Sequence, residues 1–215
     1  MSQFTTQKQQ VIDACLSLSQ AGFLAGTGGN LALRLNDELF AVTPSGADYF
    51  ALNADDICVL RLKNLEQLEG NLTPSVESGM HACMLLFKTA MQASVHTHQP
   101  IASAIALLNM DLPVNDIEDQ RALGERIAIV PYSPSGTGFL VRNFKKCLRQ
   151  HIHAYLLKNH GVICAANTME QAISNVARIE SAAADFLRLH IESSSHLSPA
   201  IRSLTLGALT PVDKE

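Results

Sequence analysis

The chain contains no tryptophan, and aromatic residues make up only 5% of its 215 residues. Proteins that bind single-stranded nucleic acid stack bases on aromatic side chains inside a positively charged groove. This sequence offers few such side chains, and its 16 Lys and Arg residues against 20 Asp and Glu give a formal net charge of −4 at pH 7. A nucleic-acid partner is therefore not expected.

Long apolar runs are also missing, although 47% of the residues are hydrophobic. No segment approaches the roughly 18 consecutive apolar residues that predict a transmembrane helix. The first ten residues, MSQFTTQKQQ, are polar and lack the apolar core of a secretory signal peptide. The sequence therefore predicts a cytoplasmic protein with a large core and no membrane partner.

The cysteines show no Cys-x-x-Cys spacing, and their odd number argues against a disulfide framework. The sequence also has no internal repeat, no low-complexity segment and no long linker, so we expect a single domain over residues 1–215. The tail over residues 193–215 is weakly patterned. We expect it to be loosely ordered or to serve in assembly.

Hydrophobic periodicity predicts a mixture of helices and strands. Helices are expected where capping boxes or apolar spacings of three and four occur, at about residues 6–22, 76–91, 100–108, 141–151 and 168–190. Strands are expected in short apolar or alternating runs, at residues 30–35, 38–46, 56–62, 93–98, 126–132 and 155–165. Because strands often follow one another in the sequence, they predict an α/β sandwich with a largely antiparallel or mixed sheet.

Two histidines stand one residue apart in SVHTH, residues 94–98. Side chains two apart on a strand point to the same face, about 6.5 Å apart along the chain, so His96 and His98 could bind one ion. The alternative is an exposed or hydrogen-bonded pair at a strand end. Because a catalytic zinc site normally takes three protein ligands and leaves one position open, the metal hypothesis requires a third ligand.

His160 is the best candidate for that ligand, because the missing side chain of Gly161 leaves room for an ion or substrate. A packed histidine bonded to the backbone is the alternative reading. The remaining histidines are assigned structural or surface roles (His81, His151, His153, His190 and His196).

Glu77 follows Pro74 and Ser75 at an expected helix N-terminus, where free backbone N–H groups favour an anion. It either satisfies the helix dipole or is a carboxylate poised for proton transfer. Two turns rich in glycine, GTGGN at residues 26–30 and TPSG at residues 43–46, are either ordinary turns or offer N–H and O–H donors to a phosphate.

Taken in order, the segments GTGGNLALRL, VTPSG, PSVESGMH, SVHTH and LLKNHGV resemble the class II aldolase/adducin family over roughly residues 5–190. The resemblance implies a central, mostly antiparallel sheet sandwiched between helical layers, in a homotetramer with active sites between neighbouring subunits. It also implies Zn²⁺ held by His96, His98 and His160. Glu77 would be the catalytic carboxylate and could ligate zinc while the site is empty.

By the same resemblance, five residues of the glycine turns and the PSVE segment would hold a substrate phosphate: Gly29, Asn30, Ser45, Gly46 and Ser75. The activity implied is that of a lyase that cleaves a small phosphorylated ketose, similar to fuculose 1-phosphate, by retro-aldol chemistry. Cleavage beside the carbonyl leaves an enediolate, and a zinc ion stabilises such developing charge as a Lewis acid.

Two positions depart from the family pattern and leave alternatives open. Val76 stands where fuculose-type aldolases carry a second serine, and Ile117 stands where they carry a tyrosine acid. The adjacent Glu118 is either a catalytic acid/base, as in the related methylthioribulose-phosphate dehydratases, or a solvated loop acid. A keto-acid phosphate decarboxylase and a non-catalytic, adducin-like assembly module are further alternatives. The retained histidines and Glu77 speak against the module, because a buried polar cluster is costly without a function.

Overall fold

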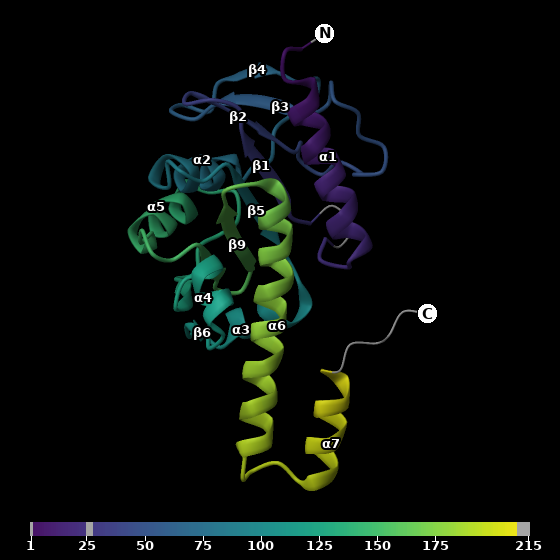
Figure 1. Ribbon diagram of the computed structural model, residues 1–215, viewed down its shortest axis with the longest axis vertical. Helices are drawn as coiled ribbons and strands as arrows, with labels where there is room; N and C mark the ends of the chain where they lie inside the picture. The colour runs from purple at the N-terminus through teal and green to yellow at the C-terminus, as the bar shows by residue number, and fades with distance from the viewer. Residues whose placement is uncertain (1, 25–27, 210–215) are drawn as a thin grey trace.

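The computed structural model describes residues 2–24 and 28–209. Within these residues the chain forms nine strands and seven helices (Figure 1). The strands are β1 (Asn30–Arg34), β2 (Leu39–Val42), β3 (Cys58–Arg61), β4 (Gln67–Glu69), β5 (Ala93–Thr97), β6 (Leu112–Pro113), β7 (Arg126–Val130), β8 (Ala154–Leu157) and β9 (Gly161–Ala166). The helices are α1 (Thr5–Gln20), α2 (Ser78–Phe87), α3 (Pro100–Leu107), α4 (Ile117–Leu123), α5 (Gly138–Cys147), α6 (Met169–Ser193) and α7 (Pro199–Ala208).

All the strands belong to one sheet, in the order β4-β3-β2-β1-β5-β9-β8-β7-β6. Neighbouring strands are antiparallel except β7 and β8, which run parallel. The predicted α/β fold with a mostly antiparallel sheet between helical layers is therefore confirmed. Because β5 lies between β1 and β9, Asn30 is paired with His96, and His96 is paired with Ile163.

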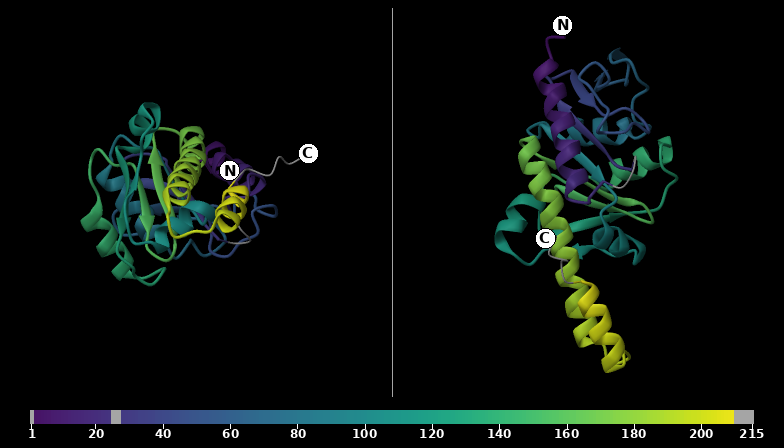
Figure 2. Two further views of the ribbon diagram at one scale, coloured as in Figure 1. Left: turned by 90° about the horizontal axis from the view of Figure 1, so that it is seen from below. Right: turned by 90° about the vertical axis from the view of Figure 1, so that its right-hand side faces the viewer.

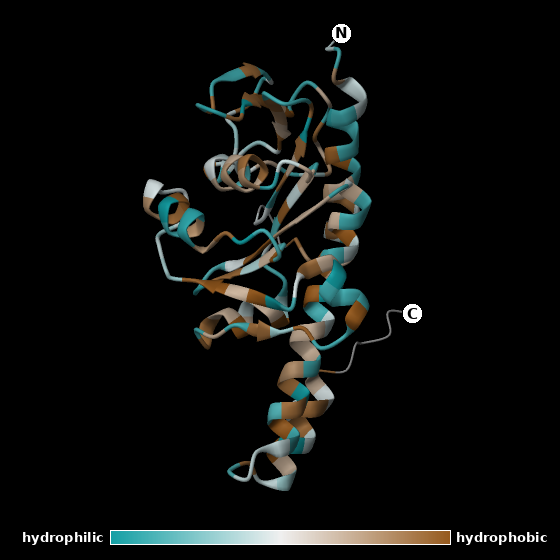
Figure 3. Ribbon diagram, turned by 60° about the vertical axis from the view of Figure 1, so that its left-hand side comes forward, coloured by the Kyte–Doolittle hydropathy of each residue, from teal (hydrophilic) through white to brown (hydrophobic). Residues whose placement is uncertain are grey.

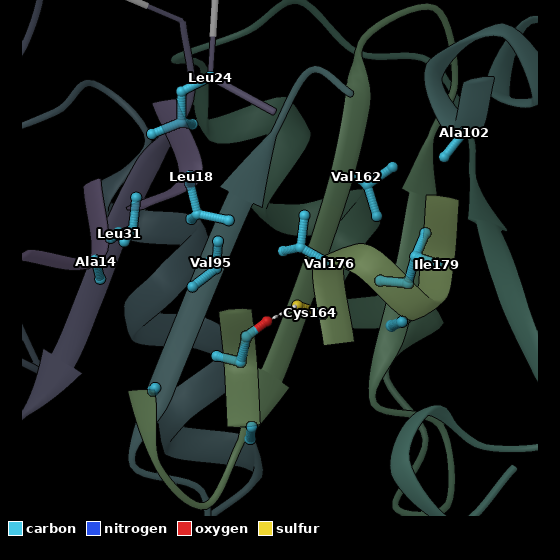
Figure 4. Close-up of a cluster of buried hydrophobic side chains, with 14 of the residues drawn as sticks. Ala14, Leu18, Leu24, Leu31, Val95, Ala102, Val162, Cys164, Val176 and Ile179 are labelled. Carbon is cyan, nitrogen blue, oxygen red and sulfur yellow. Dashed lines mark hydrogen bonds between the residues drawn. The ribbon is translucent and has the colours of Figure 1, made fainter. Parts of the chain in front are cut away.

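The helices cover both faces of the sheet. Helices α1, α3 and α6 pack on one face, and α2 and α5 pack on the other (Figures 1 and 2). The first interface holds the larger hydrophobic cluster, to which Leu18 of α1, Val95 of β5 and Val176 and Ile179 of α6 all belong (Figure 4). Since side chains alternate along a strand, Val95 on this face places Ser94 and His96 on the face that α2 covers.

The interface on the α2 side is built by a second cluster. Met80 and Met84 of α2 and Phe144 of α5 pack against Tyr155 and Ile163 of the sheet. Burial of each such large apolar side chain is worth about 1.5–3 kcal/mol relative to exposure. This packing holds the N-terminal end of α2, and with it Glu77, against β1 and β5.

The segment predicted as one strand over residues 155–165 is instead a hairpin of β8 and β9. Asn159 adopts a φ of 57°, a left-handed conformation that asparagine tolerates and that turns the chain between the strands. The turn brings His160 directly before β9. Lys158, Asn159 and His160 interrupt the apolar run before Gly161, a turn signal that the prediction of one continuous strand overlooked.

The sequence predicts a capping box at the N-terminus of two helices, and the structure shows a capping hydrogen bond at only one of them. Helix α6 begins as expected, because the side chain of Thr168 accepts a hydrogen bond from the Gln171 backbone N–H at 3.2 Å. The prediction for the first helix is wrong: α1 already begins at Thr5, so Thr6 lies inside it and caps nothing.

The tail contains a helix that the sequence pattern did not predict. Ser198 accepts a hydrogen bond from the Ile201 backbone N–H at 3.3 Å, and Pro199 is the first residue of α7. Helix α7 folds back beside the end of α6, and the pair projects from the body of the molecule with mixed apolar and polar faces (Figures 2 and 3). None of its residues is buried in the isolated chain. Among the described residues, no helix combines the length and apolarity needed to cross a bilayer.

Candidate functional site

Three histidine rings meet at one end of the paired strands β5 and β9. Their ring nitrogens lie within 4.8 Å of one another, and the centroids of the His96, His98 and His160 rings are 4.7 to 5.0 Å apart. Strand β5 supplies His96 near its end and His98 just beyond it, and the hairpin turn supplies His160. The structure thus brings together the three residues that the sequence predicted as metal ligands.

Glu77 lies against this cluster as the N-cap residue of α2. Its Oε2 atom is 3.2 Å from Nε2 of His96, and its Oε1 atom is 3.3 Å from Nε2 of His160. Asn30 donates a hydrogen bond to Oε2 at 2.9 Å, and the hydroxyl of Ser135 donates to Oε1 at 2.8 Å. The side chain of Glu77 is only 5% exposed, so these groups take the place of water.

The neutral His96 ring directs the lone pair of its Nε2 atom toward the cluster. Nδ1 of His96 lies 2.8 Å from the Val162 carbonyl and donates to it, so Nε2 carries the lone pair in the neutral ring. Burial lowers the pKa of His96 to about 3, which keeps the ring neutral. Burial acts to raise the pKa of Glu77, but His96, Asn30, His160 and Ser135 outweigh it and lower that pKa to about 2. An ionised carboxylate therefore faces the neutral ring of His96.

These residues fit a divalent cation. Neutral imidazole nitrogens and carboxylate oxygens are the ligands that zinc takes in catalytic sites, and the bond from His96 to the Val162 carbonyl orients the ring as metal ligands require. Gly161 is needed for the close packing of the rings. A Cβ atom there would lie 2.4 Å from the Thr97 carbonyl oxygen and 2.7 Å from Cδ2 of His98.

The residues expected at a phosphate lie in two groups. An isolated bridge between Pro44 and Pro74 joins the TPSG and PSVE segments, and it places Ser45 and Gly46 beside Ser75. Gly46 has a φ of 64°, and a Cβ atom there would meet nothing within 4 Å, so the turn is open on that side.

The second group, Gly29 and Asn30, lies against β5. A Cβ atom on Gly29 would come within 2.8 Å of the His96 carbonyl oxygen, so a side chain is excluded there. The amide of Asn30 is already bonded to Glu77 and His81, which the sequence did not predict. Gly26 and Thr27 of the GTGGN turn lie outside the described residues.

Glu118 does not join the cluster within one chain. It lies in the first turn of α4, its side chain is 67% exposed, and it forms an ion pair with Arg121. It lines a surface cavity together with Ala165 and Ala166, at the opposite end of β9 from Gly161. Its acid/base role stays a prediction. That role would require Glu118 to reach the histidine cluster of a neighbouring subunit.

The sequence pattern missed two residues of the site. Ser135, in the loop before α5, reaches Glu77 from a segment to which no motif drew attention. His81, for which a structural or surface role is expected, is fully buried, and its hydrogen bond to Asn30 was not predicted. Its position one helical turn after Glu77 was the only available signal, and it does not reveal the strand partner.

The chain matches the family model described as the class II aldolase and adducin N-terminal domain over residues 9–187. It is 31% identical over 176 residues to a 5-deoxy-D-ribulose 1-phosphate aldolase of Bacillus thuringiensis, covering 81% of each chain. It is 31% identical over 165 residues to the L-fuculose phosphate aldolase of Escherichia coli, covering 77% of this chain and 75% of that one. A solved structure of an L-fuculose 1-phosphate aldolase superposes with a TM-score of 0.81 at 27% identity, covering 97% of both chains.

Proposed function

The chain belongs to the class II aldolase and adducin family and to its lyases, and from this premise we propose that it is a zinc-dependent aldolase. Its substrate is a small phosphorylated ketose, which it cleaves by retro-aldol chemistry. The observation that carries the proposal is the ionised Glu77 carboxylate held between the Nε2 atoms of His96 and His160.

His96, His98 and His160 hold the metal, with Glu77 beside it. A zinc ion bound there supplies Lewis-acid stabilisation of the negative charge that develops on the substrate oxygens as the carbon–carbon bond breaks. The rest of the chemistry falls to the protein. The three imidazoles would supply the protein ligands that a catalytic zinc takes, and the burial of His96 and Glu77 keeps bulk water from their side of the site.

Glu77 moves the carbon-bound proton. In the condensation direction the ionised carboxylate removes the proton from the carbon next to the carbonyl, and in cleavage the same carboxyl group, after taking up a proton from solvent, returns it to the carbon of the enediolate. Ser135 and Asn30 hold one carboxylate oxygen each, so both oxygens have fixed directions. A positioned acid/base of this kind contributes about 10²–10⁴-fold to a rate.

The phosphate binds at Ser45, Gly46 and Ser75, on the joined TPSG and PSVE turns. The bridge between these turns supports the assignment, because it holds the segments that carry the Ser45 and Ser75 hydroxyls side by side, while the backbone N–H groups of these two residues are used in the bridge itself. Val76 supplies no hydroxyl. Its side chain is exposed instead and packs closely on Gly136, so one donor of the fuculose-type site is missing.

The active unit is a homotetramer in this proposal. Exposed apolar side chains support contacts with other subunits: Leu107, Leu108, Ile117, Ile201 and Leu204. Ile117 offers no acid group, so the group that accepts the substrate hydroxyl proton comes from elsewhere in the assembly. Light scattering on the purified protein tests this part, with four times the chain mass expected and a single chain mass contradicting it.

A panel of ketose 1-phosphates tests the reaction itself. Fuculose, 5-deoxyribulose and methylthioribulose 1-phosphates are assayed both for release of dihydroxyacetone phosphate and for loss of water. We expect triose phosphate release that stops with a chelator and returns with zinc. Water loss without carbon–carbon cleavage would instead indicate the dehydratase, with Glu118 as its acid/base.

A further inference from the structure

A line of hydrogen bonds runs from the interior of the protein to Glu77. Ser94 Oγ lies 2.8 Å from Nδ1 of His81, and Nε2 of His81 lies 2.5 Å from Oδ1 of Asn30. The Asn30 amide then reaches Oε2 of Glu77 at 2.9 Å. His81 and Ser94 are completely buried, so water does not compete for these bonds.

The acceptor at the end of this line fixes the direction of every bond in it. The ionised Glu77 carboxylate can only accept, so Asn30 must present its NH₂ group to Glu77 and its carbonyl oxygen to His81. His81 must then carry its proton on Nε2. Burial lowers the pKa of His81 to about 4, so the ring is neutral at pH 7, and its Nδ1 lone pair accepts from the Ser94 hydroxyl.

The geometry also shows what would happen without His81. An asparagine amide has a donor end and an acceptor end of nearly the same shape, so only its partners decide which end faces Glu77. If the carbonyl oxygen of Asn30 turned toward Glu77, two acceptors would face each other in a buried site. The Nε2–H of His81 makes that orientation unfavourable, because it would leave the His81 donor facing the NH₂ group.

We propose that His81 is a positioning residue that holds the Asn30 amide in the orientation that the Glu77 carboxylate requires and, through it, keeps that carboxylate in a fixed direction. Helix α2 carries both Glu77 and His81, and β1 carries Asn30, so the line ties the start of the helix to the sheet beside the histidine cluster. Among the described residues, His81 is hydrogen-bonded to the cluster only through this line. Its kinetic consequence rests on the proposed function.

The first arm of the test is independent of catalysis. Solid-state ¹⁵N spectra of protein labelled at histidine, with the His81 signal assigned by its loss in His81→Gln, report which ring nitrogen carries the proton. We expect the neutral form protonated at Nε2 at pH 7. A His81 protonated at Nδ1 would overturn the inference, because Asn30 would then have to present its NH₂ group to His81.

The second arm compares two substitutions of the same residue. His81→Gln keeps an N–H donor at about the reach of Nε2, whereas His81→Leu fills the space without a donor. We expect His81→Leu to lower kcat about 10- to 100-fold, as is typical for groups that orient catalytic residues. KM and bound zinc per chain should change little. His81→Gln should restore most of kcat.

Met84→Leu is the matched control, because Met84 is equally buried on α2 but packs in the second hydrophobic cluster. It should leave kcat unchanged. Equal kcat in His81→Gln and His81→Leu, whether both are wild-type or both are impaired, would overturn the positioning role. If the wild-type protein cleaves no ketose phosphate, the proposed function fails, and the ¹⁵N spectrum alone decides the inference.

Discussion

Glu77 and Glu118 both lie at the N-terminal end of a short helix, yet their surroundings have nothing else in common. Glu77 is 5% exposed and faces two imidazoles, an amide and a hydroxyl, all from other segments of the chain. Glu118 is 67% exposed and faces Arg121, a residue of its own helix. The difference is made by the strands: α2 packs on β1 and β5, and α4 has solvent on its outer side.

The comparison distinguishes a buried carboxylate, whose charge the surrounding residues must compensate, from an exposed carboxylate, whose charge is compensated by water. A buried charge is expensive, with an effective penalty of several kcal/mol per ion, unless hydrogen bonds and opposite charge offset it. The donors to Glu77 do this in part, and a cation would complete it. Glu118 keeps its hydration, and an exposed pair such as its contact with Arg121 is worth about 0–1 kcal/mol.

The largest expected effect is that of Glu77→Gln. The amide has the shape of the carboxylate but neither accepts nor delivers the carbon-bound proton, so the cleavage rate should fall about 10²–10⁴-fold. The assay is triose phosphate release, with thermal unfolding as the control for folding. A variant that retains wild-type activity would remove Glu77 from the reaction.

Gly161→Ala should have the next largest effect. The new Cβ atom would lie 2.4 Å from the Thr97 carbonyl oxygen, which is backbone and cannot turn away as a side chain does. Overpacking of this kind costs about 1–3 kcal/mol, and here it also displaces the His98 ring. Denaturant unfolding and zinc titration measure the two losses. Gly138→Ala is the control, since its Cβ atom would meet nothing within 4 Å.

The stability of the metal-free protein should fall as the pH drops below about 6.5. Burial lowers the pKa of His81 to about 4 in the folded state, so between these pH values the unfolded chain binds a proton that the folded protein excludes. The stability is therefore present above the unfolded pKa and is lost as the pH falls toward 4. Denaturant unfolding from pH 7.5 to 4.5 should show a weaker pH dependence in His81→Gln than in the wild-type protein.

The smallest effect is expected from Glu118→Gln. Because Glu118 is solvated and outside the histidine cluster, cleavage should stay within about twofold of wild type, as exposed pairs contribute little. Loss of activity in this variant with an intact tetramer would assign Glu118 a role at a neighbouring subunit's site and would break the contrast with Glu77.

Local periodicity was sufficient to predict most of the fold. Alternation along β5 predicted that His96 and His98 share a face, and the apolar spacing of α2 predicted that a helix follows Glu77. His160 was singled out by the adjacent Gly161 and then by the resemblance of the five segments, because no spacing connects it to β5. The contact of His160 with His96 and His98 depends on which strands are neighbours in the sheet, because β9 pairs with β5 across more than sixty residues of chain.

The residues that escaped prediction depend on contacts of this long-range kind. Ser135 and His81 reach Glu77 directly or through Asn30, and neither lies in a segment whose pattern specifies a partner. The hairpin turn at Asn159 was missed for a different reason: the polar residues Lys158, Asn159 and His160 do mark a turn, but they were included in one long strand because apolar residues flank them on both sides. Pairing between distant strands cannot be predicted from a pattern that describes one segment at a time.

The central claim is that three imidazoles from two distant segments bind one divalent ion beside Glu77. The most direct test is the metal content of wild-type protein and His96→Ala after dialysis with zinc and gel filtration. We predict about one zinc per chain in the wild type, the ratio of a three-histidine catalytic site, and almost none in the variant. Stoichiometric zinc retained by His96→Ala, or none bound by the wild type, would contradict the account.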